Sequence, residues 1–208
     1  MTADSPWPVI HAERAALAED LAGLTDAQWA TPSLCWDWSV RDVLGHMTAT
    51  AGLTPGGFIT RFAASGFRFH KMNAANVARE TGGAPADVLT RFRAVINETK
   101  HPPGPVDAML GEVIIHSADI RRPLGISHDY PAAAVTRVAD FCMRSNLLLG
   151  GKKRSSGLAL HATDTEWSGG SGPVVSGPAL SLVLAITGRS AALTDLSGDG
   201  LATLRARN

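Results

Sequence analysis

The segment from Val106 to Gly125 places the strongest constraint on the fold of this chain, because its pattern is helical and largely apolar. The run Val113–Ile115 is apolar at three consecutive positions, so much of the surface of this helix must be buried. Pro123 disfavours helical backbone at the residue before it, and Gly125 tolerates the left-handed conformation found at helix C-termini. We therefore expect a largely buried helix that ends near Arg122.

Three side chains that could bind a metal or take part in catalysis lie within this apolar helix. Glu112 and His116 are four residues apart, which places them on one helical face with Cβ atoms about 5–6 Å apart. Both could then bind one metal ion, and Asp119 lies on the same face, where it could orient a ligand or transfer a proton. Taken alone, such a pair is more often a structural polar contact than a metal site, so a third ligand is needed.

Other segments with apolar residues at helical spacing predict the partners of this helix. Proline- and glycine-containing turns separate them, and long helices with short connections are typical of a four-helix bundle. We therefore predict a mainly α fold, in which a four-helix bundle is followed by a small α+β part. The expected helices span 9–24, a stretch beginning near the N-cap Ser39, parts of 58–80 with a break at Gly66, 85–99, 106–122 and 132–149.

His46 supplies the third candidate ligand. It lies in the helix that begins near Ser39, among apolar residues, and therefore points at least partly inward. Two imidazoles and one carboxylate suit Zn²⁺, with a fourth position left for water or substrate. The same set also describes the facial triad of non-haem iron(II) oxygenases, which we rank lower because those sites are usually carried on β-barrels.

The chain changes character after residue 150. Residues 150–157 are glycine-rich, polar and basic, and we interpret them as a linker. Beyond them, 158–162, 174–176 and 201–205 are strand-like, and 179–187 resembles a short helix. We predict a helical metal-binding domain at 1–151 and a small α+β domain at 157–208.

Composition excludes some partners. Lys plus Arg and Asp plus Glu are both 19, so the net charge is zero and no global field favours nucleic acid or an anionic membrane. The two cysteines, Cys35 and Cys142, could form at most one disulfide. No secretory signal or bilayer-spanning run is apparent, so we expect a soluble, cytoplasmic protein with small-molecule partners. The sequence leaves the oligomeric state open.

Several motifs together resemble the mycothiol-dependent maleylpyruvate isomerase family, whose N-terminal half belongs to the DinB-like metal-binding four-helix superfamily. The motifs are W-S-V-R-D-V-L-G-H at Trp38–His46, E-V-I-I-H-S-A-D-I-R-R-P-L-G at Glu112–Gly125, A-T-D-T-E-W at Ala162–Trp167, T-G-R at Thr187–Arg189 and S-G-D-G at Ser197–Gly200.

The resemblance implies specific roles. A divalent metal, usually zinc, would be held by His46, Glu112 and His116. The C-terminal part would be similar to sterol carrier proteins, and Arg189 would serve thiol-cofactor binding or catalysis. Without the resemblance, Arg189 can equally be an arginine that complements a helix dipole.

The activity implied is a metal-assisted reaction of the thiol mycothiol. The thiol would add reversibly to an activated double bond, as in cis–trans isomerisation, or would be transferred to a small-molecule electrophile. Two alternatives remain open. One is a metal-dependent hydrolase, in which the metal holds water, and the other is a non-catalytic protein that encloses a small apolar ligand.

Overall fold

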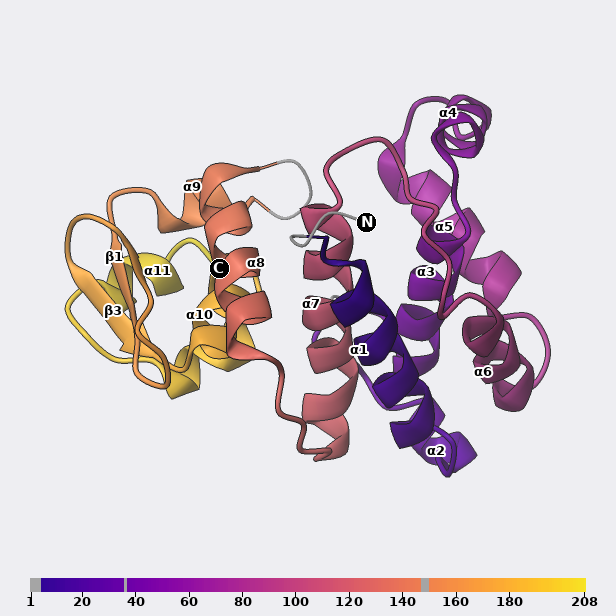
Figure 1. Cartoon of the computed structure of the whole chain (residues 1–208), viewed down its shortest axis with the longest axis horizontal. Coiled ribbons are helices and arrows are strands. Elements are labelled where there is room, and N and C mark those ends of the chain that lie inside the picture. The colour runs from indigo at the N-terminus through magenta and orange to yellow at the C-terminus, as the bar shows by residue number, and fades with distance from the viewer. Residues whose placement is uncertain (1–4, 36, 147–149) are drawn as a thin grey trace. The chain divides into compact units, whose positions relative to one another are not determined.

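A computed structural model describes residues 5–35, 37–146 and 150–208, which divide into two compact units with the boundary between His128 and Asp129 (Figure 1). The first unit is helical, and the second combines helices with a small sheet. The helices of the first unit are α1 (Trp7–Asp20), α2 (Asp26–Trp29), α3 (Val40–Ala51), α4 (Pro55–Ala64), α5 (Phe69–Glu80), α6 (Pro85–Ala94) and α7 (Asp107–Leu124).

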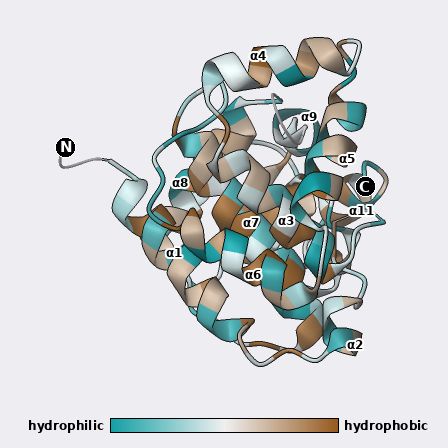
Figure 2. Ribbon diagram, turned by 90° about the vertical axis from the view of Figure 1, so that its right-hand side faces the viewer, coloured by the Kyte–Doolittle hydropathy of each residue, from teal (hydrophilic) through white to brown (hydrophobic). Residues whose placement is uncertain are grey.

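In the first unit α7 packs against α1 and α3, α6 packs against the same two helices, and α3 packs most extensively against α5. Helices α1, α3, α6 and α7 form the predicted bundle. Val113, Ile114 and Ile115 are fully or almost fully buried, and the apolar sides of α3 and α7 are visible in brown in Figure 2. Within the described parts of the chain, no helix is both long enough and apolar enough to cross a membrane.

The helix boundaries of this unit follow local signals in the sequence. Ser39 caps α3, because its hydroxyl accepts from the backbone N–H of Asp42 and the carboxylate of Asp42 accepts from the backbone N–H of Ser39. Gly125 ends α7 in the left-handed conformation, with φ of 68°. Gly66, with φ of 67°, separates α4 from α5 as predicted.

The second unit contains a three-stranded sheet with the strand order β2-β1-β3. The central strand β1 pairs antiparallel with β2 and parallel with β3. Helix α10 packs against both β1 and β3 and also against α8. The elements of this unit are α8 (Ala132–Arg144), α9 (Gly151–Ser155), β1 (Ala159–Ala162), β2 (Ser168–Gly170), β3 (Val174–Gly177), α10 (Ala179–Ile186), the 3-10 helix η1 (Ser190–Asp195) and α11 (Leu201–Arg205).

Two local predictions for this unit are wrong. The segment 201–205 is not strand-like but forms α11, because Leu201 and Leu204 are also at helical spacing and the fully buried Leu204 anchors the helix. The predicted linker 150–157 contains the short helix α9, in which Gly151 and Ser155 are buried against α8. A Cβ at Gly151 would lie 2.7 Å from the carbonyl oxygen of Cys142, so glycine permits this close packing.

The contact boundary also differs from the predicted domain division. Helix α8 was assigned to the bundle by its apolar stripe, but it packs against α9, α10 and β2, so the compact units divide before it. An apolar stripe shows that a helix is buried without specifying its partner. The boundaries of independently folding domains are a separate question. The division into domains at 1–151 and 157–208 remains a prediction. The predicted helix 132–149 ends at Arg144, and residues 147–149 lie outside the described residues.

Candidate metal centre

The two predicted histidine ligands lie together in the first unit. His46 of α3 and His116 of α7 have ring centroids 5.0 Å apart, with an angle of 79° between the ring planes. Two imidazoles that bind one tetrahedral zinc ion through Zn–N bonds of about 2.0–2.1 Å have centroids about 5 Å apart. The spacing of the two rings therefore fits ligation of one metal ion.

Glu112 lies one helical turn before His116, and its carboxylate is buried without a hydrogen-bond partner at either oxygen. Burial raises the pKa of Glu112 to about 7, although the positive charges of Arg14 and His116 oppose this shift. Buried polar atoms are almost always paired, since leaving them unpaired costs free energy. A carboxylate in this state is suited to a cation, although among the described residues the ligand atoms of His46, Glu112 and His116 do not all lie within 4.8 Å of one another.

Asp119 contacts His116 from the following turn of α7. Its carboxylate oxygen accepts a hydrogen bond from Nδ1 of His116 over 2.8 Å, and both side chains are buried. This contact fixes the ring and leaves Nε2 as the nitrogen that can bind a metal. Burial lowers the pKa of His116, but Asp119 and the nearby thiol of Cys35 outweigh this effect and raise the pKa to about 9. The surroundings of His116 therefore stabilise positive charge, which a metal ion would also bring.

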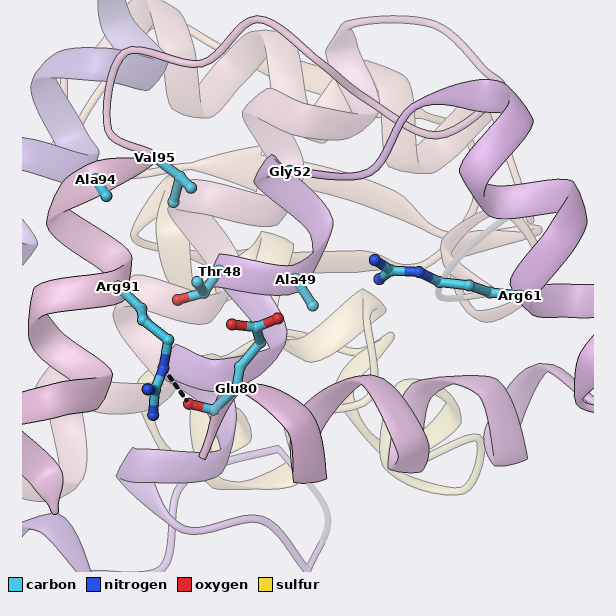
Figure 3. A pocket seen from close by; sticks show the side chains of 8 residues that line it. All are labelled: Thr48, Ala49, Gly52, Arg61, Glu80, Arg91, Ala94 and Val95. Atoms are coloured by element: carbon cyan, nitrogen blue, oxygen red, sulfur yellow. Dashed lines mark hydrogen bonds between the residues drawn. The ribbon is translucent and has the colours of Figure 1, made fainter. Parts of the chain in front are cut away.

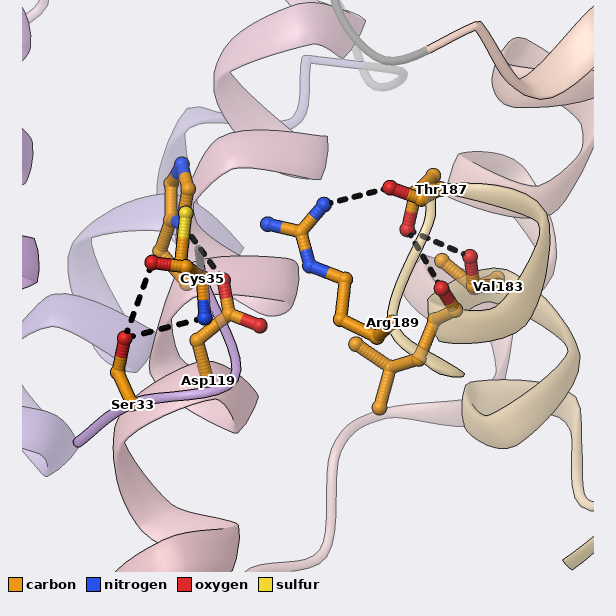
Figure 4. A network of polar contacts seen from close by, with 8 residues as sticks. Ser33, Cys35, Asp119, Val183, Thr187 and Arg189 are labelled. Carbon is orange, nitrogen blue, oxygen red and sulfur yellow. Dashed lines mark hydrogen bonds and ion pairs between the residues drawn. The ribbon is translucent and has the colours of Figure 1, made fainter. Parts of the chain in front are cut away.

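Cys35 also lies beside His116, which the sequence did not indicate. Its Sγ, a ring nitrogen of His116 and a carboxylate oxygen of Asp119 all lie within 4.8 Å of one another. Figure 4 shows Cys35 and Ser33 beside Asp119. The sequence signalled only a free or disulfide-bonded cysteine, and the structure contains Cys35 and Cys142 as buried free thiols. Nothing in the spacing of Cys35 from His116 along the chain indicates that they meet.

Two further residues line this region. Arg14 of α1 is almost fully buried; its Nη1 donates to the carbonyl oxygen of Glu98 over 3.0 Å, and its Nη2 makes no hydrogen bond. The ring of Trp38 lies 5.0 Å from that of His46 and helps to cover it. An arginine on an amphipathic helix gives no sign in the sequence that it is buried.

Arg189 belongs to the second unit, where it follows α10. It is buried, and its Nη1 donates to the carbonyl oxygen of Thr187 over 2.8 Å (Figure 4). Burial raises the pKa of Cys142 in the same unit to about 12, although the charge of Arg189 opposes this rise. The role of Arg189 in binding a thiol remains a prediction.

A pocket of about 230 Å³ lies elsewhere in the first unit (Figure 3). It is smaller than the roughly 300–1,000 Å³ of typical ligand sites, and charged side chains form much of its lining. It therefore does not favour the alternative of a protein that encloses an apolar ligand. The lining residues are Thr48, Ala49, Gly52, Arg61, Glu80, Arg91, Ala94 and Val95.

Comparisons with known proteins identify the family and the fold of this chain. The model of the family described as mycothiol maleylpyruvate isomerase N-terminal domain matches residues 10–121, which is more than half of the 208 residues. The match includes His46, Glu112, His116 and Asp119, and ends before Arg189. A comparison with curated proteins gives no match.

Two crystal structures of the mycothiol-dependent maleylpyruvate isomerase, one of them a His-to-Ala mutant, share the fold of this chain. Each has a TM-score of 0.63 and 15% sequence identity, and the alignment covers 93% of this chain and 91% of the other. At this identity the likeness establishes the fold alone.

Proposed function

This chain belongs to the mycothiol maleylpyruvate isomerase N-terminal domain family, and from that premise we propose that it is a metal-dependent enzyme of a low-molecular-weight thiol. The metal is zinc or another divalent ion, its ligands are His46, Glu112 and His116, and the thiol is mycothiol. The reaction is transfer of the thiol to a small electrophile or isomerisation like that of maleylpyruvate.

The observation that carries the proposal is the buried carboxylate of Glu112, both of whose oxygens make no hydrogen bond. It lies one turn from His116, whose ring is 5.0 Å from that of His46. A purely structural cluster would be expected to pair these oxygens. Their unpaired state, next to two imidazoles, supports a site prepared for a cation.

The protein's own residues define what such a site does. Asp119 keeps Nδ1 of His116 protonated and so directs Nε2 toward the ligand position. Trp38 covers one side of His46 and limits the access of water. A metal bound here would supply a positive charge that holds a thiol as its nucleophilic thiolate at neutral pH.

Transfer and isomerisation share their first bond-forming step. The thiolate sulfur attacks an electrophilic carbon of the substrate. In isomerisation, the carbon–carbon double bond becomes single and rotates, and loss of the thiolate restores the double bond. In transfer, a leaving group departs or a proton is added, and the thiol stays bound to the product. We assign recognition of the thiol to Arg189, as a cation that can pair with a polar group of mycothiol.

The test begins with elemental analysis of the purified protein, for which we expect about one divalent metal ion per chain. Product formation from maleylpyruvate, and from a panel of electrophiles, is then followed with and without mycothiol. We expect turnover only with the thiol and the metal, and loss of both metal and turnover in His46→Ala and His116→Ala.

Arg189→Met separates thiol recognition from metal binding. We expect it to raise the KM for mycothiol while the metal content stays at the wild-type value. Absence of bound metal, or equal turnover without any thiol, would overturn the proposal. Cleavage of esters or amides by the metal-loaded protein without thiol would instead favour a hydrolase.

A further inference from the structure

A second set of ligand-capable atoms converges on His116, apart from Glu112 and His46. Cys35, His116 and Asp119 are all buried, and they offer atoms that lie within 4.8 Å of one another. Sulfur and nitrogen ligands of one tetrahedral zinc ion are about 3.5 Å apart. The limit of 4.8 Å includes this separation, so Cys35 and His116 lie close enough together to be ligands of one ion.

The backbone around Cys35 fixes this thiol against α7. The N–H of Leu34 donates to the carbonyl oxygen of Asp119 over 3.1 Å, which attaches the loop to the turn of α7 that follows His116. The N–H of Cys35 donates to Oγ of Ser33 over 3.0 Å, and the N–H of Trp38 donates to the carbonyl oxygen of Cys35 over 3.1 Å. The backbone of Cys35 and of the preceding Leu34 is thus held, so the proximity of the thiol to His116 is built into the fold.

We propose that Cys35 is a thiolate ligand of the divalent metal that binds at His116. The inference rests on the proposed function, because a metal must bind there, and Cys35 would fill the fourth position beside His46, Glu112 and His116 until mycothiol displaces it. A thiol that coordinates a metal loses its proton, so Cys35 would bring a negative charge and a soft sulfur ligand to the centre. Such a ligand favours zinc over magnesium, calcium or manganese, which prefer oxygen.

Cobalt(II) provides the test, because a thiolate bound to Co²⁺ gives an intense charge-transfer band in the near ultraviolet. The chain has two cysteines, so in Cys142→Ser the remaining thiol is that of Cys35. We expect Cys142→Ser to bind about one equivalent of Co²⁺ with this band, and Cys35→Ser/Cys142→Ser to lack it. His116→Ala in the Cys142→Ser background should also lack the band.

A second measurement does not depend on the folding of a Cys35 variant. In Cys142→Ser, the rate at which Cys35 is alkylated is measured with and without Zn²⁺. We expect Zn²⁺ to change the alkylation rate at least about tenfold, because coordination removes the thiol proton and places the sulfur lone pair on the metal.

The outcomes separate this inference from the proposed function. Stoichiometric Co²⁺ binding without a charge-transfer band, together with an alkylation rate unchanged by Zn²⁺, would overturn the role of Cys35 and leave the metal-dependent function intact. Failure of the wild-type protein and of Cys142→Ser to bind Co²⁺ or Zn²⁺ would overturn both.

Discussion

Two buried polar clusters of the first unit use the same helices, α1 and α7, in opposite ways. The first, which we call the ionic cluster, consists of Glu13, Asp20, Arg121 and His128. Nε of Arg121 donates to the carboxylate of Asp20 over 2.7 Å. The carboxylate of Glu13 lies 2.8 Å from Nε2 of His128 and 3.8 Å from Arg121. In the second, the Glu112 site, the carboxylate of α7 has Arg14 of α1 nearby but makes no hydrogen bond.

We interpret the first cluster as one that serves the fold and the second as the proposed ligand site. Burying charges costs several kcal/mol per ion, and hydrogen-bonded partners offset that cost. The ionic cluster contains its own partners, so it ties α1 to α7 and to His128. At the Glu112 site no hydrogen bond offsets the free-energy cost of burying the charge, and a bound cation would offset it. Removal of a partner should therefore weaken the fold at the ionic cluster, whereas changes at the Glu112 site should weaken metal binding.

The largest expected effect is on stability, at the ionic cluster. Arg121→Met keeps much of the side-chain volume but leaves the buried Glu13 without that cation, so the free energy of unfolding should fall by about 3 kcal/mol. The measurement is chemical denaturation of the metal-free protein. The control is Arg93→Ala, which removes the exposed pair with Glu19 and should cost less than about 1 kcal/mol. Equal effects of both variants would contradict the contrast between clusters.

The second prediction compares two buried glutamates. Glu112→Gln removes a proposed ligand and should lower metal affinity more than about 100-fold, which exceeds the effect of residues outside the ligand shell. Glu13→Gln should leave metal affinity unchanged and reduce stability. Both affinities are measured by competition with a chromophoric chelator, and similar losses in the two variants would contradict the assignment.

Glu112→Gln should also stabilise the metal-free protein at high pH. Because the pKa of Glu112 in the folded state, about 7, is above its ordinary 4.5, the cost of burying the charge is absent below pH 4.5 and complete above pH 7. Denaturation at pH 8 should therefore favour Glu112→Gln over wild type. At pH 4.5 the advantage should disappear, and an advantage independent of pH would contradict the explanation.

The third prediction concerns the residue that orients His116. Asp119→Asn keeps the shape of the side chain but removes the charge that fixes the imidazole, so metal affinity measured above pH 9, where His116 has lost its proton in both proteins, should fall about 10- to 100-fold. Ser117→Ala is the matched control, since this buried residue lies between the two on α7 and should leave metal affinity unchanged. Unchanged metal affinity in Asp119→Asn would show that the contact with His116 is structural only.

The last prediction concerns the change of metal affinity with pH, which for a single pH unit is the smallest effect. The metal must displace a proton from His116, whose pKa is about 9, so affinity should rise about tenfold per pH unit between pH 7 and 9 and level off above. The rise should be steeper below pH 7, where Glu112 is also protonated. In Asp119→Asn the plateau should begin at lower pH, because the main cause of the raised pKa is gone. A flat profile from pH 7 to 9 in wild type would contradict this origin.

Much of the helical unit follows from local sequence. Ser39 and Asp42 specified the start of α3, and Gly66 specified the break between α4 and α5, because capping and left-handed turns depend on neighbouring residues. The predictions that failed concern segments whose local sequence is ambiguous. The five residues of α11 are too few to distinguish strand from helix, and the glycine-rich start of α9 gave no sign of burial against α8.

The sequence alone determined that Glu112, His116 and Asp119 share one face, because the pitch of a helix relates residues three and four apart. It also predicted His46 as an inward residue of a second helix. Only the tertiary structure decided that the two imidazoles lie 5.0 Å apart, that Cys35 approaches His116 and that Arg14 is buried near Glu112. These contacts join residues distant along the chain, and their geometry depends on how helices and loops pack, which no periodicity encodes.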